Sequence, residues 1–329
     1  MPPPGVDDAT FANRLVAPRE SADRRRGRAT DSAEATALAA APGKEGDGDG
    51  QRRVGQLAVW NAGAIEIGTI DQRTDRAKIT ATTSGLSAGM DIKLSNRLIA
   101  GLGVGYGNEV SWIGGSAAHL RGESTMVAGY ASYSPVDAAF IDGMIGLGQI
   151  DYRMRRKVTD VDAIASGYRE GDMIFGALSA GIERSNDALR WSAYGRVEWM
   201  NANLGAYAET GAGRYNLRWD KRSLTSLGGV LGGRAEWMRK TGFGSVTPHF
   251  RGEWRHEFAN SDPQWIDYAD IAGIALHRID SQGWRRDQID LSLGTRFDLS
   301  SWLLDLEYAM SVSAGQRSGR LKMGLSKEF

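Results

Sequence analysis

The chain has 329 residues with 40 basic and 40 acidic side chains, so its formal net charge at pH 7 is zero. This balance offers no electrostatic basis for binding nucleic acid. The lack of cysteine excludes a disulfide framework and a thiolate metal site. Glycine is abundant at 43 residues and proline scarce at 8, which is typical of strands that crowd and curve. The 10 Trp and 10 Tyr are residue types enriched where a membrane meets water.

The N-terminal segment, residues 1–54, is rich in Pro, Arg, Ala, Asp and Gly. A segment of this composition cannot bury enough apolar surface to fold alone. We predict a linker that is either disordered or partly helical. The helical alternative rests on a capping box formed by Asp31 and Glu34. The helix would cover Ala35–Ala41 and end at Pro42–Gly43.

The start of the chain, Met1–Gly5, lacks the apolar core of a signal peptide. An exported protein needs such a peptide. We therefore expect that either the coding sequence begins upstream of Met1 or the chain is the C-terminal part of a longer protein. No run reaches the roughly 20 apolar residues of a membrane helix, but strands of a membrane barrel carry only a weak, alternating signal.

Residues 55–329 form the second predicted domain, with about twelve amphipathic strands joined alternately by short and long connections. A barrel in an outer membrane sorts its connections in this way, because its periplasmic rim carries tight turns and its outer rim carries long loops. Short connections are predicted at residues 94–96, 134–137, 185–187, 239–242 and 300–301, with a compact last one at 313–318. Long polar stretches are predicted at residues 69–78, 107–121, 153–169, 205–217 and 259–284.

Two glycine-containing motifs in the first strands suggest chemistry that their context does not support. Gly85–Gly89 matches the G-x-S-x-G nucleophile elbow, which requires a sharp turn from strand to helix. Here Leu86 and Met90 lie on one face of an amphipathic strand, so we predict no catalytic role for the serine. Gly101–Gly107 resembles a dinucleotide-binding loop but lacks the following helix. Because the four histidines also show no metal-ligand spacing, we predict no enzyme, no cofactor and no metal.

The strands of the C-terminal half show a clear two-residue period. In His249–Phe258, one face carries Phe250, Trp254 and Phe258, and the other carries alternating Arg and Glu. The same division recurs in residues 191–199, 227–237, 288–298 and 302–312. The strands near residues 126–133 and 140–152 contain so many small residues that their pattern does not determine which face points inward.

The composition of the charged face distinguishes a membrane barrel from a water-soluble barrel. A water-soluble barrel would place its apolar face inside. Here the polar face mixes Gly and Ser with nearly equal numbers of Arg and Glu, which favours a narrow wet lumen where opposite charges pair across strands. A register slip in the strand at residues 249–258 would expose charges to lipid at about 2–4 kcal/mol for an Arg at mid-membrane. The predicted lumen-lining residues are Arg196, Glu198, Arg234, Glu236, Arg251, Glu253, Arg255, Glu257, Asp290, Arg296, Asp305 and Glu307.

The number of strands predicts how wide the lumen is and therefore what it can hold. Eight strands leave an interior that side chains fill, and sixteen leave an open channel. We expect a pore of intermediate width from twelve strands. An α-helix is roughly 10–12 Å across, so the lumen would hold one helix or one extended chain.

Several segments resemble the C-terminal β-domain of autotransporters, the translocators of type V secretion. They are Leu98–Gly107, Asp142–Gly146, Glu209–Gly213 and, most specifically, Arg251–Phe258. The resemblance covers about residues 59–329. It implies a twelve-stranded antiparallel barrel in the outer membrane of a Gram-negative bacterium, a helix from the N-terminal segment threaded through the pore, and an upstream passenger carried to the cell surface.

The last strand, Leu321–Phe329, ends on an aromatic residue, as strands of this family do for recognition by the barrel-assembly machinery. The predicted assembly signal consists of Leu321, Met323, Leu325 and Phe329, all facing lipid. Lys327 departs from the family pattern, because an aromatic or apolar residue is usual there. The implied partners are outer-membrane lipid, the barrel-assembly machinery, periplasmic chaperones and the N-terminal segment itself. Residues 1–60 contain no Asn-Asn pair, so no cleavage site is assigned.

The sequence thus predicts an all-β outer-membrane translocator without enzymatic turnover, which anchors an N-terminal passenger and helps export it. The alternative is a stand-alone outer-membrane pore or structural barrel in which residues 1–53 are a tail.

Overall fold

The computed structural model describes residues 18–19, 31–32, 54–70, 78–114, 118–136, 138–186, 188–242, 244–259, 263–270, 277–279, 286–299, 302–314 and 316–328. The predicted helix at Ala35–Ala41 lies outside these residues. Asp31, its predicted cap, lies in the two-residue strand β2 (Asp31–Ser32), which pairs with β1 (Pro18–Arg19).

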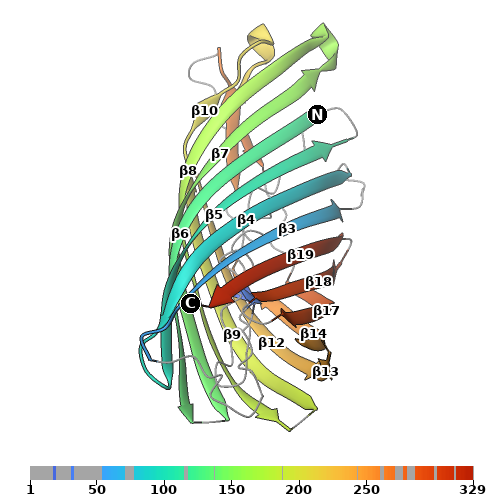
Figure 1. The fold of residues 1–329 in the computed structure, drawn as a ribbon. Helices are drawn as coiled ribbons and strands as arrows, with labels where there is room; N and C mark the ends of the chain where they lie inside the picture. Colours follow the sequence, from blue (N-terminus) through green and yellow to red (C-terminus); the bar gives the residue numbers. More distant parts are fainter. Residues whose placement is uncertain are drawn as a thin grey trace.

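The described part of the chain is dominated by a closed barrel of twelve antiparallel strands (Figure 1). Each strand pairs with the next, and β12 pairs directly with β14. The last strand pairs back onto the first from Gln316 to Glu328, which leaves no open edge. The strands are β3 (Leu57–Ile70), β4 (Ile79–Lys93), β5 (Leu98–Ile113), β6 (Ala118–Val136), β7 (Ala139–Val158), β8 (Ala163–Ser185), β9 (Leu189–Leu204), β12 (Arg222–Trp237), β14 (Gly244–Glu257), β17 (Asp287–Leu299), β18 (Trp302–Ser313) and β19 (Gln316–Glu328).

The connections at one rim are all short. At the opposite rim, here named the far rim, residues 71–78, 205–221 and 258–286 form longer connections, but residues 114–117, 159–162 and 314–315 are as short as the turns of the first rim. The first strand begins and the last strand ends at the rim with the short connections, because Glu328 pairs with Ala58 and Lys327 pairs with Trp302 at the start of β18. One predicted turn is shorter than expected: residues 239–241 form β13 (Arg239–Thr241), which continues β12 after a break at Met238.

Two of the predicted long polar stretches are wrong. Residues 107–121 are mostly strand, because β5 continues to Ile113 and β6 begins at Ala118. Residues 153–169 are likewise occupied by β7, the turn η1 (Thr159–Val161) and the start of β8. A strand that projects beyond the hydrocarbon layer carries polar residues on its outer face without cost, so polarity there does not mark the end of a strand. In Figure 1, β7 and β8 reach past the ends of β3, β4, β5 and β6.

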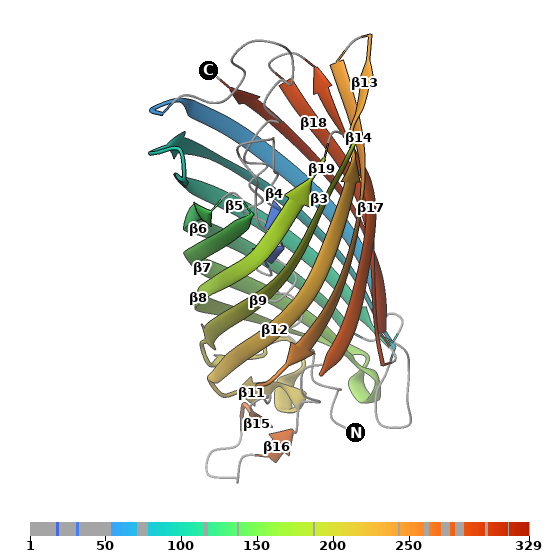
Figure 2. The ribbon, with the colours of Figure 1, turned by 90° about the horizontal axis from the view of Figure 1, so that it is seen from below.

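The two longest connections, residues 205–221 and 258–286, fold together at the far rim. They contribute β10 (Tyr207–Ala208), η2 (Gly213–Tyr215), β11 (Leu217–Trp219), β15 (Gln264–Tyr268) and β16 (His277–Ile279). The four strands form a small sheet, here named the rim sheet, and Figure 2 shows β11, β15 and β16 at the end of the barrel. Its apolar side packs Tyr207 against Trp219 at 5.8 Å between ring centroids, next to Met154 of β7.

The outer face of the barrel is apolar. Leu231 is 60% exposed and Leu293 is 65% exposed, as the two-residue period of the C-terminal strands predicts. The structure also settles the two strands whose pattern was ambiguous: Val127 and Leu147 point outward, and Phe140 points inward. Among the described residues, no helix is long and apolar enough to span a membrane.

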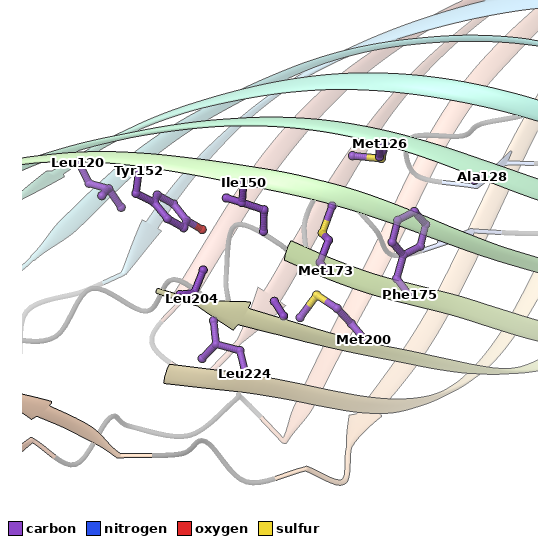
Figure 3. Packing of buried hydrophobic residues seen from close by; sticks show 11 residues of the cluster. Leu120, Met126, Ala128, Ile150, Tyr152, Met173, Phe175, Met200, Leu204 and Leu224 are labelled. Atoms are coloured by element: carbon purple, nitrogen blue, oxygen red, sulfur yellow. The ribbon is translucent and has the colours of Figure 1, made fainter. Parts of the chain in front are cut away.

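The inner face is less uniformly polar than predicted. A cluster of buried apolar side chains lines one side of the interior (Figure 3). Phe175 lies over Gly146 and Met173 lies over Gly148, so large side chains occupy the space that glycines on the neighbouring strand leave free. The cluster consists of Leu120, Met126, Ala128, Ile150, Tyr152, Met173, Phe175, Met200, Ala202, Leu204 and Leu224.

This packing predicts that Gly146→Ala destabilises the barrel by about 1–3 kcal/mol through overpacking, because a Cβ there would overlap the Phe175 ring. Gly143→Ala on the same strand is the matched control, since its Cβ would meet Leu178 only at 3.8 Å. The measurement is the temperature at which the purified barrel loses its folded mobility on a gel. Equal shifts for both variants would contradict the assignment of Gly146 to the packed inner face.

Candidate functional site

The charged residues predicted to line the lumen are all buried, and they alternate with exposed residues such as Val197 and Trp254. They therefore lie on the inner face of the barrel. They come from β9, β12, β14, β17 and β18, which are neighbours and form one continuous charged wall. Their role in transport stays a prediction. The set is Arg196, Glu198, Arg234, Glu236, Arg251, Glu253, Arg255, Glu257, Asp290, Arg296, Asp305 and Glu307.

The best-formed contact in this wall joins Arg196 of β9 to Glu253 of β14. The guanidinium donates from Nη1 and Nη2 to the two carboxylate oxygens at 3.1 and 3.2 Å. Nε of Arg196 donates to Glu198 at 2.7 Å, and the Tyr194 hydroxyl donates to Glu253 at 2.6 Å. A bidentate guanidinium–carboxylate pair is among the strongest hydrogen-bonded contacts in proteins.

These side chains reach across an entire strand, because β12 lies between β9 and β14. Glycines on the inner face of β12 make the crossing possible. A Cβ at Gly232 would lie 2.6 Å from the Tyr194 ring, and a Cβ at Gly228 would lie 3.0 Å from Arg255. Arg255 in turn is 2.7 Å from Glu198. The curvature of the barrel and these missing side chains together bring the charges of β9 and β14 within contact.

A second group of charges lies on the same wall, centred on Arg296 of β17. Its Nη2 lies 3.7 Å from both Glu236 and Asp305. Arg251 of β14 contacts Glu307 of β18, again across an intervening strand, and its Nε donates to Ser292 at 3.2 Å. Nearly every charge in the wall therefore has an opposite charge beside it. Such pairing offsets the cost of removing charges from water.

The structure adds inward-facing polar residues that the sequence-based list omitted. Arg190 is 3.2 Å from Glu236, and Arg320 of β19 is 3.2 Å from Glu66 of β3 across the closing seam. His249 lies 3.8 Å from Asp305 and 3.7 Å from Glu307. The signal was present, because each of these residues shares the parity of the charged face in its strand.

The lumen thus has two chemically different sides. The charged wall extends from β9 to β18, with further buried charges on β19, β3, β4 and β5, and the apolar cluster occupies β6 to β9 and one residue of β12. Such a lining offers partners both for the polar backbone groups and for the apolar side chains of a polypeptide. Within the described ranges, no group of three or more His, Asp or Glu residues is placed to hold a metal ion. Ser87 is buried in the middle of β4, away from any strand-to-helix turn.

Comparison with known proteins identifies the architecture. The sequence profile of the family described as "Autotransporter beta-domain" matches residues 59–309. This chain belongs to that family. The β-domain has the closed twelve-stranded barrel that the resemblance implied, and the family places it in the outer membrane of Gram-negative bacteria. No curated protein matches the sequence.

Solved structures of autotransporter barrels are similar to this β-domain in fold. The translocator domain of NalP from Neisseria meningitidis matches with a TM-score of 0.67 at 14% identity, over 87% of this chain and 90% of that one. The Bordetella BrkA β-domain gives 0.63 at 18% identity, over 83% and 100%. The transport unit of AIDA-I from Escherichia coli gives 0.57 at 12% identity, over 84% and 91%.

The final strand of the β-domain presents its predicted assembly residues outward. Leu321 and Met323 are exposed and Leu325 is half-buried, whereas Phe329 lies outside the described residues. Lys327, the departure from the family pattern, also lies at an outward position. Its ammonium group is 5.0 Å from the centre of the Trp302 ring, a cation–π contact that stabilises the charge near the rim.

Proposed function

We propose that this β-domain anchors an N-terminal passenger in the outer membrane and that the passenger crosses through the lumen described above. The proposal rests on the lining of the lumen. In a closed barrel that belongs to the autotransporter β-domain family, this lining has paired charges on one side and apolar side chains on the other. Arg196 and Glu253 already satisfy each other. A polypeptide that passes through the lumen therefore meets few unpaired charges that would bind it tightly. Weak binding favours transport, because a transported molecule must be able to leave the pore.

The direct test is export of a reporter. A signal peptide and a small tagged reporter domain fused ahead of Met1 should bring the reporter to the cell surface, where external protease removes it while the barrel stays intact. A fusion lacking residues 316–329, which include β19, is the control because its barrel cannot close. A reporter that stays in the periplasm next to a fully assembled barrel would contradict the translocator assignment.

We further propose that residues 1–53 occupy the pore as a linker. Deleting them should raise the single-channel conductance of the purified barrel in planar bilayers, because ions would then fill the vacated space. Deleting an equal length of unrelated linker, fused ahead of residue 1, is the control and should leave conductance unchanged. Equal conductance with and without residues 1–53 would favour the stand-alone pore, in which this segment is a tail.

Two further parts of the proposal concern partners and chemistry. The barrel-assembly machinery and periplasmic chaperones would deliver and insert the chain, as its family membership implies. The β-domain would act without enzymatic turnover. An esterase assay tests the second statement, since hydrolysis that Ser87→Ala abolishes would overturn it.

A further inference from the structure

The outer face of β6, β7 and β8 is apolar along the middle of the strands, here named the apolar band. Toward the far rim this face becomes polar. The exposed apolar residues that end this band are Val127, Leu147 and Ile174, and Ile164 is the one exposed aliphatic residue beyond them on these strands, at the tip of β8. Between this band and Ile164 the outward positions are polar and lie opposite one another in rows across the three strands. The successive rows are Thr125, Gln149 and Asp172; Glu123, Asp151 and Glu170; Arg121, Arg153 and Tyr168; and His119 with Arg155.

The upper rows contain a concentration of positive charge. Arg121 lies directly opposite Arg153, and like charges directly opposite destabilise a sheet. Their nearest carboxylate is Glu123, at 3.2 Å from Arg121 and 3.9 Å from Arg153. The side chains of Arg121 and Arg153 remain 50% and 64% exposed. Arg155 is exposed and has no ion pair within the described part of the chain.

The two carboxylates of the row below, Asp151 and Glu170, form no ion pair with these arginines within the described residues. The hydroxyl of Tyr168 lies 2.8 Å from Asp151 and 2.9 Å from Glu170, so these two carboxylates share the tyrosine as a partner. On the neighbouring wall of β9 and β12, the outer polar residues are uncharged. There Asn201 donates to Thr225 at 3.2 Å, and Ser223 donates to Asn203 at 3.0 Å. The outer face of β9 and β12 therefore lacks the exposed positive charge that β6 and β7 carry.

The height of the arginines narrows the choice of partner. A strand rises about 3.3 Å per residue and tilts by about 45° in a membrane barrel. Arg121, six residues beyond Val127 on β6, thus stands roughly 14 Å above the apolar band. The row of Arg155 stands roughly 19 Å above it. The headgroup layer of an ordinary bilayer adds only about 5–8 Å on each side, so phospholipid phosphates lie below these arginines.

We propose that Arg121, Arg153 and Arg155 bind phosphate groups on the sugar core of a lipopolysaccharide in the outer leaflet. A phosphorylated saccharide extends beyond the headgroup layer to the height of these side chains. Guanidinium groups bind phosphate through paired, charge-assisted hydrogen bonds. An anion between Arg121 and Arg153 would also remove their mutual repulsion. The inference rests on placement in the outer membrane and not on passenger transport.

The test measures binding of lipopolysaccharide with a phosphorylated core to the purified full chain in detergent. The triple variant Arg121→Gln, Arg153→Gln, Arg155→Gln should bind roughly tenfold more weakly or worse, through the loss of charge-assisted contacts. Arg97→Gln, Arg184→Gln, Arg239→Gln is the matched control, because it removes three exposed arginines near the turns of the opposite rim. It should bind like the unaltered protein. The difference should shrink at high salt, which screens exposed charges.

Two further ligands identify the source of the phosphate. For lipopolysaccharide with a dephosphorylated core, the β6–β7 triple variant, the control variant and the unaltered protein should all have the same affinity. The same result is expected for detergent-solubilised phosphatidylglycerol. Undiminished binding by the β6–β7 triple variant would overturn the proposal, as would an equal loss in the control. A tenfold loss toward phosphatidylglycerol would assign the arginines to phospholipid headgroups and also overturn it. Folded mobility on a gel verifies that each variant forms the barrel.

Discussion

Replacing Glu253 by Gln should destabilise the barrel by about 3–5 kcal/mol, the usual cost of removing one partner from a buried ion pair. The variant leaves Arg196 facing an uncharged amide inside the lumen, while Glu198 is already shared with Arg255. The free energy of unfolding, obtained from urea titration of the barrel in detergent micelles, measures the effect. Export of a passenger need not change in parallel, since the measurement concerns stability alone.

Two controls make this result specific. Glu123→Gln removes one partner of the exposed pair with Arg121 and should cost less than about 1 kcal/mol. The double variant Arg196→Met, Glu253→Gln removes both charges and should recover a substantial part of the loss. A cost for Glu253→Gln as small as that for Glu123→Gln would mean that water solvates the Arg196 side chain and that the charged wall is not a desolvated network.

Removing Phe329 should eliminate most of the heat-modifiable barrel from outer-membrane fractions while synthesis of the chain continues. The family pattern makes the terminal aromatic residue part of the signal that the assembly machinery reads. β19 must also pair with both β18 and β3, because unpaired backbone groups in hydrocarbon each cost several kcal/mol. Immunoblots of fractionated cells, with and without heating, provide the measurement.

Phe329→Tyr is the control for this deletion, since it retains an aromatic terminus and should assemble normally. Replacing Lys327 by Leu restores the apolar residue usual in the family and should assemble at least as well, although it removes the contact with Trp302. Normal assembly after deletion of Phe329 would contradict the role given to the terminal residue and place the signal elsewhere in β19.

The alternation of residues was sufficient to predict which way the C-terminal strands face. In β14 the large aromatic Phe250 and the charged Arg251 are neighbours, and only one assignment keeps charge away from lipid. The same reasoning places Lys322 inside and Leu321 outside, as the structure does. It did not resolve β6 and β7, because glycine and alanine are tolerated on both faces. Their orientation became clear only when Met126 and Phe140 were seen to fill the interior.

Polarity proved a poor guide to where strands end. The charged segment containing Arg153 is a strand and not a loop, because β7 and β8 keep pairing beyond the apolar band. A charge costs free energy on the outer face only at the depth of the hydrocarbon, and the sequence does not mark that depth. The arginine rows on β6 and β7 were consequently hidden within stretches assigned to loops.

The sequence by itself determined the class of fold, the parity of the charged strands and the family, because a two-residue period and a sequence profile are local or additive properties of the chain. Only the tertiary structure decided which charges pair. Arg196 and Glu253 are 57 residues apart and meet across β12, so their contact depends on strand register, barrel curvature and the glycines between them. The apolar side of the lumen has the same origin, since it forms only when the closed barrel brings the inner faces of β6, β7, β8 and β9 together.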